Sequence, residues 1–532
     1  MMGKRRKLPI GIQTFAEMIE EGHYYVDKTP FADRLIDQGK YYFLSRPRRF
    51  GKSLFLDTLK ELFEGHEALF RGLYIHDRWD WHKRRPVVML SFGGAVLHSR
   101  EALDRRIRFL LRNSRKALGI PETDAEDIVG DFQNLIRDAA QQYGERVVLL
   151  IDEYDKPILD NITQSDVALE LRDGLRNLYS VIKECDAYLQ FCLLTGVSKF
   201  SKVSLFSGLN NLNDITLDAE YSAICGYTDQ EVDQVFAPEL PDFDREQIRH
   251  WYNGYNWLGE SVYNPFDVLL LFQKKQFRPY WFETATPTFL VKLLAERGFS
   301  TPKLASLLSG AQLLSRFDVD DIEPEALLFQ CGYLTFHRAE QPLLGRWEYT
   351  LGYPNHEVRI SLNEALLPAY GVPTQVADTT GRRVLSALRQ QDFPALKVQF
   401  EALFASIPYH WQSNNPLAQY EGYYASVFYS YLAAIGLDLA PEDVSSMGRV
   451  DLRLALDGVI ILIEFKVVPD VATGQALTQL RERDYAAKYR GTGQPLYLLG
   501  VEFSKATRQI VGFEWQVCVS NVSATRPWPL KK

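Results

Sequence analysis

A predicted β-hairpin between residues 449 and 468 constrains the fold of this chain most strongly. Two runs rich in β-branched and large apolar residues flank the pair Asp457-Gly458. An Asp-Gly pair in that position favours a type I′ turn, because both central residues of such a turn need positive φ. A two-residue turn pairs Leu456 with Val459, and this pairing fixes the register of every other residue on both strands.

The register divides the hairpin into two faces, since side chains alternate across a strand. One face is wholly apolar and is expected to join the core: Val450, Leu452, Leu454, Leu456, Val459, Ile461, Ile463, Phe465 and Val467. The other face carries the charged side chains beside three apolar ones: Asp451, Arg453, Glu464 and Lys466, with Ala455, Ile460 and Leu462.

The charged face brings two carboxylates together. Asp451 falls directly opposite Glu464, and opposed side chains lie about 4.5–5.5 Å apart at Cβ. Two acids at that separation repel each other unless a cation lies between them, and such oxygen-rich pairs suit Mg²⁺. Lys466 points the same way and is expected to position or deprotonate a water, or to stabilise charge on a phosphate. The alternative is the charged outer face of an ordinary sheet.

A phosphate-binding motif lies near the N-terminus. A short β-rich run, residues 41–44, leads through a Pro-containing turn to Gly51-Lys52-Ser53 and an amphipathic helix. Strand, loop, Gly-Lys-Ser and helix are the order of a P-loop, in which backbone N–H groups and a helix N-terminus cradle phosphates. Lys52 is expected to reach the β- and γ-phosphates of a nucleotide, and Ser53 its Mg²⁺.

The loop departs from the usual pattern at Arg46, which replaces the first glycine. Glycine normally gives this position backbone freedom. The loop is therefore expected to have another shape, or to bind nucleotide less well. Arg46, Arg48 and Arg49 would keep it attractive to anions, and the alternative is a basic turn before a helix.

A Walker B pattern follows about a hundred residues later. Residues 147–151 are an apolar run, typical of a strand buried on both faces of a parallel sheet. The run ends in Asp152-Glu153, where Asp152 is expected to hold Mg²⁺ and Glu153 to orient the attacking water. Residues 86–92 predict an additional strand between the two motifs in the sequence.

Another buried run, residues 188–194, precedes a polar segment. A polar residue after such a strand is where AAA-type ATPases keep a sensor of the γ-phosphate. Ser198 is the candidate for this sensor, and Thr195 is the alternative. For either residue, the competing interpretation is an ordinary turn residue.

The helix predicted over residues 101–118 has an apolar face and a basic face. The basic face gathers five side chains: Arg105, Arg108, Arg112, Arg115 and Lys116. A basic stripe can follow a phosphate backbone or contact an acidic domain. A solvated face is the competing interpretation.

Three segments together carry a family resemblance: RPRRFGKS at 46–53, LLIDEYDKP at 149–157, and LTGVSKFSKVSLFSGLNNLNDIT at 194–216. They resemble the bacterial AAA-ATPase-like family that is usually fused to a C-terminal PD-(D/E)XK nuclease domain. The resemblance runs over residues 8–290 and again from 388 to the end, and residues 25–29 share it. It accounts for Arg46, because the family has the same R-P-R-R-F-G-K-S loop.

The resemblance also assigns roles in the C-terminal part. Asp451 matches the first acid of the PD-(D/E)XK pattern, and Glu464-Phe465-Lys466 matches its (D/E)-x-K. Glu421 lies on a helix predicted to begin at residues 420–424, and it matches the acid that joins the metal shell. Gln479 and Tyr485, on a helix predicted over residues 474–489, match family positions near the substrate backbone.

These motifs predict an α/β chain with two functional modules. The first is an N-terminal P-loop, AAA-like parallel sheet with a helical lid. The second is a C-terminal mixed α/β domain like that of restriction endonucleases. The expected boundaries are 1–215 for the ATPase core, 216–300 for the lid, 301–380 for a connector and 381–532 for the nuclease-like domain.

Composition limits the environment of the chain. Its five scattered cysteines have no metal-ligand spacing and indicate reduced thiols in a cytoplasmic protein. No apolar run approaches the roughly 18 residues of a membrane span, and the basic start lacks the apolar segment of a signal peptide. The net charge of −8 argues against a surface that is basic throughout and binds nucleic acid everywhere, but it does not exclude a local basic groove.

The predicted function is that of an ATP-binding, ATP-regulated and Mg²⁺-dependent DNA nuclease. Defence against foreign DNA is a setting suggested by the architecture alone. The predicted cofactors are ATP and Mg²⁺, and the predicted partners are a nucleotide and nucleic acid. The alternative is a nucleotide-switched DNA- or protein-binding protein without cleavage, or with little ATP turnover. The assembly state is left open, with a homo-oligomer among the possibilities.

Overall fold

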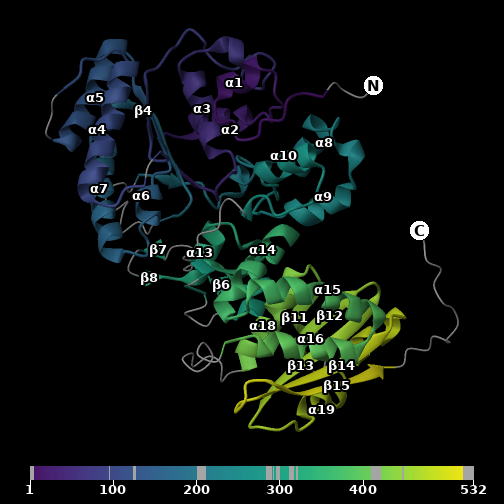
Figure 1. Ribbon diagram of the computed structural model, residues 1–532. Coiled ribbons are helices and arrows are strands. Elements are labelled where there is room, and N and C mark those ends of the chain that lie inside the picture. Colours follow the sequence, from purple (N-terminus) through teal and green to yellow (C-terminus); the bar gives the residue numbers. More distant parts are fainter. Residues whose placement is uncertain are drawn as a thin grey trace. The chain divides into compact units, whose positions relative to one another are not determined.

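The computed structural model in Figure 1 describes residues 5–94, 96–123, 127–199, 211–282, 290–291, 293–294, 300–310, 317–318, 321–408, 421–445 and 448–518. The chain divides into two compact units, and each is described by itself. The first comprises Met1–Thr286 with Leu308–Glu357, and the second comprises Pro287–Leu307 with Val358–Lys532. Residues 200–210 of the third family segment, Tyr420 and the end of the chain from residue 519 lie outside the described residues.

A five-stranded parallel sheet forms the centre of the first unit, in the order β2-β3-β4-β1-β5. The strands are β1 Tyr41–Ser45, β2 Val87–Ser91, β3 Val147–Asp152, β4 Leu189–Gly196 and β5 Asn213–Asp214. The predicted strands are confirmed, because β1, β3 and β4 are buried along almost their whole length. Since β4 lies between β1 and β3, the P-loop strand and the Walker B strand both flank it.

Helices cover both faces of this sheet. Figure 1 shows α4, α5 and α7 packed together on one side, with α1, α2 and α3 on the other. Their bounds are α1 Phe15–Glu20, α2 Thr29–Gln38, α3 Lys52–Phe63, α4 Arg100–Ala117, α5 Ile128–Tyr143, α6 Lys156–Leu159 and α7 Ser165–Glu184. Helix α4 matches the amphipathic helix predicted over residues 101–118.

A helical lid follows the sheet, as predicted. It contains α8 Asp229–Val235, α9 Arg245–Tyr252 and α10 Pro265–Lys274. Its apolar side chains form one core with Tyr24 and Val26 from the N-terminal segment. The aromatic residues of this region therefore serve mainly to pack the lid, as the large buried set around Tyr252 and Tyr263 shows.

Two buried acids join α10 to the start of α14 (His356–Leu366). Asp267 and Glu357 are both fully buried, and their carboxyls face each other. The backbone N–H of Trp281 donates to Glu357 Oε1 at 2.9 Å. Burial raises the pKa of Asp267 to about 7, and burial together with Asp267 raises the pKa of Glu357 well above its ordinary value. The pair therefore holds at least one proton at neutral pH.

The segment predicted as a connector contains regular structure and is divided between the two units. Its first-unit part includes α13 Pro324–Gln330 and the hairpin of β9 Thr335–Leu343 with β10 Arg346–Gly352. β10 also pairs with β6 Leu307–Gly310, and β7 Phe317–Asp318 pairs with β8 Asp321–Ile322. The four-part division of the sequence stays a prediction.

The second unit is built on a five-stranded mixed sheet in the order β11-β12-β13-β14-β15. The strands are β11 Asp438–Ser445, β12 Gly448–Leu456, β13 Val459–Val468, β14 Leu496–Ser504 and β15 Ile510–Cys518. β13 and β14 are parallel, and the other neighbours are antiparallel. The predicted mixed α/β domain is thus confirmed.

Helices cover both faces of this second sheet. Helices α15 Thr374–Gln390, α16 Phe393–Ala405 and α18 Glu421–Ala434 lie on one side, where Phe428 packs on Phe465. Helix α19 Gln475–Glu482 lies on the other side and packs on Ile460 and Leu462. The second face of the hairpin is therefore apolar and buried at its turn end, and polar around Asp451 and Glu464.

Two details of the sequence analysis need correction. Val450 packs with Ile460 and Leu462 instead of on the opposite face, because Glu442, opposite Asp451, has a φ of 50° and interrupts the regular alternation there. The helix predicted over residues 474–489 ends at Glu482, since Asp484 adopts a φ of 44° and a 3-10 turn follows.

No helix among the described residues combines the length and apolar content that crossing a membrane requires.

Candidate nucleotide and metal sites

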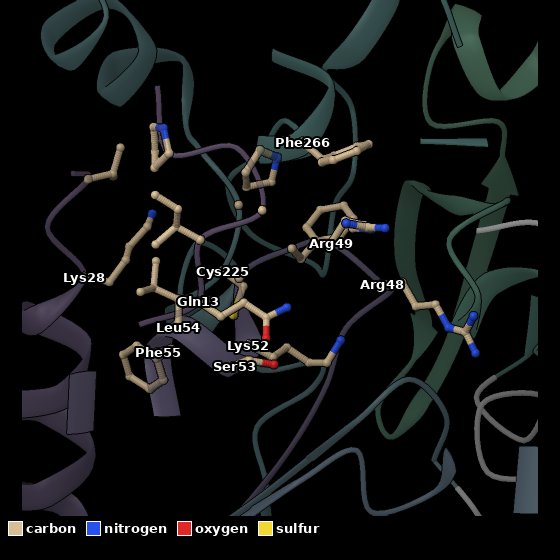
Figure 2. Close-up of a pocket in the computed structure, with 18 of the residues that line it drawn as sticks. Gln13, Lys28, Arg48, Arg49, Lys52, Ser53, Leu54, Phe55, Cys225 and Phe266 are labelled. Atoms are coloured by element: carbon tan, nitrogen blue, oxygen red, sulfur yellow. The ribbon is translucent and has the colours of Figure 1, made fainter. Parts of the chain in front are cut away.

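A cavity of about 400 Å³ lies over the start of α3 in the first unit (Figure 2). Five stretches of the chain line it, within residues 9–13, 24–28, 48–58, 224–227 and 265–269, together with Gly93, Glu153, Lys156 and Val197. Its walls combine apolar side chains from the N-terminal segment and the lid with the polar loop 48–53. One end thus suits an apolar ring and the other a charged group.

The loop before α3 has the backbone conformation of a phosphate cradle. Arg49 and Gly51 have φ of 71° and 95°, and α3 begins at Lys52, so its first N–H groups face the cavity. Lys52 Nζ donates to the carbonyl oxygens of Arg46 at 2.8 Å and Pro47 at 2.9 Å. Burial lowers the pKa of Lys52 while Asp152 opposes that shift.

Arg46 is a buried structural residue, and the expectation that it attracts anions is wrong. Its guanidinium donates to the carbonyl oxygens of Ser45, Thr216 and Tyr221 at 2.8–2.9 Å, and it lies 4.1 Å over the Trp257 ring. It is fully buried, and burial lowers its pKa to about 10. A glycine here could not make these contacts, which explains the departure from the usual loop.

The other two loop arginines are exposed and line the cavity. The Arg49 guanidinium lies 4.5 Å over the ring of Phe266, on the lid helix α10. Figure 2 shows Arg48 directed away from Lys52. Arg48 and Arg49 both line the cavity, and their contact with phosphates stays a prediction.

The Walker B residues meet the P-loop. Ser53 Oγ donates to Asp152 Oδ2 at 2.6 Å, and Thr195 Oγ1 donates to Asp152 Oδ1 at 2.8 Å. Glu153 lines the cavity with a φ of 51°, a strained backbone conformation of the kind that occurs at functional sites. Burial and the charge of Asp152 raise the pKa of Glu153.

Ser198, the candidate sensor, contacts Asp155. Its hydroxyl and its backbone N–H both donate to Asp155 Oδ2 at 2.6 Å. Asp155 is buried and also accepts from the N–H of Val197 at 3.0 Å. Thr195, the alternative, contacts the Walker B carboxylate instead. Sequence reasoning missed Asp155, although its place within the DEYD run could have drawn attention to it.

Residues 25–29 contribute Lys28 to the cavity wall. Lys28 Nζ donates to both carboxylate oxygens of Glu231 at 2.6 and 2.8 Å, and to the carbonyl of Ala223. Asp27 accepts from the N–H of Thr29 at 2.9 Å and so stabilises the start of α2. Gln13 also lines the cavity, and no sequence signal pointed to it because it is remote from every motif.

The second candidate site lies on the hairpin of β12 and β13, where the predicted turn is confirmed and the predicted register is confirmed as far as Leu452 and Ile463; the predicted pairing of Asp451 with Glu464 lies beyond that ladder. Asp457 and Gly458 have φ of 48° and 81°, and Leu456 pairs with Val459. The regular pairing continues to Leu452 and Ile463. At the next step, Asp451 Oδ2 accepts from the backbone N–H of Phe465 at 2.8 Å, so its carboxylate crosses to the neighbouring strand.

Glu464 is the most buried acid of this site. It is 1% exposed, and its Oε1 accepts from Lys466 Nζ at 3.0 Å and from the amide of Gln479. Its Oε2 is buried without a hydrogen-bond donor among the described residues. Burial and Asp451 raise the pKa of Glu464 to about 7.

Lys466 joins the remaining acid to this group. Its Nζ lies 3.7 Å from Glu421 Oε1, at the first residue of α18. Burial raises the pKa of Glu421 and also that of Asp451. A set of carboxylate oxygens with one buried oxygen left without a donor fits Mg²⁺, which takes oxygen ligands and keeps several waters. The residue types at Asp451, Glu464 and Glu421 suit Mg²⁺, but their oxygens do not all lie within 4.8 Å of one another in this structure, so the ion site stays a prediction.

The two residues assigned to the substrate backbone differ in their surroundings. Gln479 contacts Glu464 directly, so it orients the buried carboxylate. Tyr485 is 4% exposed and packs in the core around Leu462 and Leu480. The break after Glu482 turns Tyr485 inward, which the helical pattern of the sequence could not indicate.

Comparisons with known proteins agree with this architecture. A family model described as "Predicted AAA-ATPase" matches residues 9–206, and one described as "PD-(D/E)XK nuclease superfamily" matches residues 419–513. An "Uncharacterized protein in vnfD 5′region" of Azotobacter chroococcum mcd 1 is 59% identical over 511 residues, covering 96% of this chain and 98% of that protein. The structure of the Aeropyrum pernix ORC2 protein in ADPNP-ADP complexes matches with 10% identity and a TM-score of 0.29, covering 64% of this chain and 92% of that one.

Proposed function

Because the chain belongs to the family that joins a predicted AAA-ATPase domain to a C-terminal PD-(D/E)XK nuclease domain, we propose that it is an ATP-binding, Mg²⁺-dependent DNA nuclease. One observation carries the nuclease half of the proposal. The buried carboxylate of Glu464 contacts Lys466 beside Asp451 and Glu421, and one of its oxygens is left without a donor among the described residues.

In the proposed reaction, Asp451, Glu464 and Glu421 supply the oxygens that hold the ion. A bound Mg²⁺ would polarise the scissile phosphate and lower the pKa of an attacking water. Gln479 fixes the rotamer of Glu464 through its hydrogen bond to Oε1. Lys466, held beside two of these acids, orients the water or stabilises the charge that develops on the phosphate.

In the proposed nucleotide site, the loop 48–53 surrounds the phosphates. Lys52 exchanges its bonds to the carbonyls of Arg46 and Pro47 for the β- and γ-phosphates. Ser53 and Asp152, already hydrogen-bonded to each other, hold the Mg²⁺ of the nucleotide. Glu153 orients the hydrolytic water, and Thr195 senses the γ-phosphate through its contact with Asp152.

We propose that ATP regulates cleavage, in a cytoplasmic protein with a role in defence against foreign DNA. The second candidate is a nucleotide-switched binding protein with little ATP turnover. It is favoured by the closed arrangement of Lys52, whose ammonium is satisfied by the carbonyls of its own loop. Exchange of these bonds on nucleotide binding would change the loop conformation without requiring hydrolysis.

Plasmid cleavage tests the nuclease proposal. The wild type should nick or linearise plasmid DNA with Mg²⁺ and do nothing with EDTA. Lys466→Ala should lose cleavage, because it removes the charge beside the reacting phosphate. Lys397→Ala is the matched control, since this lysine is half-exposed on α16 and paired only with Glu401 in the same helix among the described residues. Cleavage by Lys466→Ala at the wild-type rate would contradict the role given to Lys466.

Isothermal titration tests the nucleotide proposal. Lys52→Ala should lose measurable ATP affinity, and circular dichroism checks that the variant is folded, because the substitution also leaves the carbonyls of Arg46 and Pro47 without the Lys52 donor. Unchanged ATP affinity would show that the loop is not a phosphate cradle.

A further inference from the structure

An arginine without a partner lies at the end of the second sheet that carries the proposed metal ligands. Nη1 of Arg508 is buried, and it has no hydrogen-bond acceptor among the described residues. No described residue forms an ion pair or a cation–π contact with the Arg508 side chain either. Burying a charged donor without an acceptor costs free energy, so such a group needs a physical explanation.

The two fully buried arginines of the described chain both have partners. The guanidinium of Arg46 donates to three carbonyl oxygens. Arg115, which the sequence analysis placed on the basic face of a helix, is bonded to Asp131 and Asp138. Arg508 differs from both, because none of the described residues accepts a hydrogen bond from its guanidinium.

The backbone of Arg508 is held by a tight turn between β14 and β15. Ser504 is fully buried, and its hydroxyl accepts from the N–H groups of Ala506 and Thr507 at 3.2 and 3.0 Å. Its carbonyl oxygen accepts from the N–H of Arg508 at 2.8 Å. Arg508 has a φ of 61°, a conformation that costs a non-glycine residue free energy and occurs at functional sites. The turn therefore fixes the position from which the guanidinium extends.

This turn lies at the same end of the sheet as Lys466. β13 and β14 are parallel, and Lys466 is paired with Glu502 while Val468 is paired with Ser504. The N–H of Lys505 donates to the carbonyl oxygen of Val468 at 2.8 Å. The turn thus begins only two residues beyond Lys466 along the parallel strands.

The first turn of α18 connects Arg508 with Glu421. Glu421 begins α18, and the backbone N–H of Val467 donates to its carboxylate. Tyr424 lies one helical turn further and stacks on Phe503, with 4.3 Å between the ring centres. Burial raises the pKa of Tyr424 to about 12, and the positive charge of Arg508 opposes this shift. The guanidinium of Arg508 therefore lies near the part of α18 that carries Glu421.

The acids of this region leave the charge of Arg508 unpaired. Glu502 accepts from three backbone N–H groups at the start of α19, at 2.6–3.1 Å. Glu421 is paired with Lys466. Asp470 is exposed on the neighbouring loop and forms no ion pair among the described residues. The guanidinium of Arg508 is thus available to an anion that comes from outside the chain.

We propose that Arg508 binds a backbone phosphate of the DNA strand that is cleaved, beside the phosphate at the proposed metal site. This contact rests on the proposed nuclease function and extends it to the substrate strand beyond the scissile bond. A guanidinium offers parallel N–H donors that match two oxygens of one phosphate. The bound phosphate supplies the acceptor that Nη1 lacks. Arg508 is a substrate-binding residue and does not touch the reacting atoms.

Fluorescence anisotropy of a labelled short DNA duplex on the full chain in EDTA tests this contact without cleavage. Arg508→Gln should bind about tenfold more weakly than the wild type at low salt, because it loses a charged hydrogen-bond donor. Its plot of log affinity against log salt should be shallower by about 0.9, the value for one phosphate contact on a duplex. Arg508→Lys should recover part of the affinity and the wild-type slope, since it keeps the charge and loses only the parallel donors.

Steady-state cleavage with Mg²⁺ separates substrate binding from chemistry. The KM of Arg508→Gln should rise about tenfold while its kcat stays near the wild-type value, because the contact is made equally in the ground state and the transition state. Arg389→Gln is the matched control, since Arg389 is exposed and bonded to Asp457 in the hairpin turn, at the opposite end of β13. This control should keep the affinity, the salt slope and both kinetic constants of the wild type.

Urea unfolding separates this role from a structural one. Arg508→Gln should unfold at the same urea concentration as the wild type or a higher one, because it removes a buried charge that has no partner. A lower unfolding midpoint with unchanged DNA affinity would show that Arg508 is structural and overturn the proposal.

The remaining outcomes separate this proposal from the nuclease function. If the wild type cleaves plasmid DNA while Arg508→Gln keeps the wild-type affinity and KM, the Arg508 contact alone is refuted. A loss confined to kcat, or an equal loss of affinity in Arg389→Gln, would refute it as well. If the wild type neither binds nor cleaves DNA, the proposed nuclease function is refuted together with it.

Discussion

Replacing Asp267 by asparagine should make the protein more stable at alkaline pH. Asp267 and Glu357 are fully buried carboxyls that face each other. Neither forms an ion pair with a basic side chain among the described residues. Ionising both acids in this apolar site is therefore unfavourable, and the folded protein holds a proton that the unfolded chain would release.

The sign of the effect follows from the direction of the pKa shift. The pKa of Asp267 rises from 3.8 to about 7 on folding, so the folded state binds a proton more tightly than the unfolded state. The contribution of Asp267 to the free energy of unfolding is then highest below pH 4 and falls as the pH rises toward 7. At 1.36 kcal/mol per unit, this shift corresponds to about 4 kcal/mol lost between those limits. The carboxamide of the Asp267→Asn variant would not ionise, and it can still accept a hydrogen bond from the protonated Glu357.

Urea unfolding at several pH values between 4.5 and 8.5 measures this difference. The wild type should lose stability steeply between pH 5 and 7, whereas Asp267→Asn should show a shallower profile and exceed the wild type at pH 8. Asp242→Asn is the control, because Asp242 is exposed and bonds with Lys275 and Arg5 lower its pKa. Parallel pH profiles for the wild type and Asp267→Asn would refute the reasoning, since they would show that the buried pair does not hold an extra proton.

Three further substitutions probe the two candidate sites. Glu464→Gln should lose most of the stabilisation that Mg²⁺ gives the wild type, which is about 2.7 kcal/mol at an ion concentration a hundred times the dissociation constant. Thermal melts of both proteins in EDTA and in excess Mg²⁺ measure this stabilisation, and equal responses of the two proteins would place the ion elsewhere. Glu153→Gln should keep ATP binding, because Asp152 and Ser53 remain, and should slow hydrolysis at least tenfold in a phosphate-release assay. Hydrolysis at the wild-type rate would contradict the role of Glu153. Arg46→Met should destabilise the ATPase unit by about 3 kcal/mol in urea unfolding, since it leaves three carbonyl oxygens without the Arg46 donors. A loss of ATP affinity without a loss of stability would show instead that Arg46 contacts the nucleotide.

Some features of this protein follow from short stretches of sequence. The turn at Asp457-Gly458 was predictable because its backbone angles depend on two adjacent residues. From that turn, strand alternation predicted the pairing of Leu456 with Val459 and brought Asp451 close to Glu464. The apolar runs 147–151 and 188–194 predicted buried parallel strands for the same local reason. In each case the information lies within a few residues of the position concerned.

Other features depended on groups that are distant in the sequence. Arg46 replaces a loop glycine, but its role was decided by the carbonyls of Thr216 and Tyr221, which lie 170 and 175 residues away. Ser198 was the candidate sensor and Thr195 the alternative, and only the fold showed that Asp155 lies beside the first and Asp152 beside the second. The partners of a polar side chain are set by tertiary packing, which no local pattern encodes.

The hairpin of β12 and β13 combines features that the local sequence predicted with features that tertiary packing decided. Its alternation indicated a polar second face, yet α19 packs on Ile460 and Leu462 on that face, and Gln479 of α19 contacts the buried Glu464. The sequence alone determined which residues share a face of the hairpin over most of its length. Only the packing of α19 decided how much of that face became core, because burial depends on which element docks there, and docking joins residues far apart in the chain.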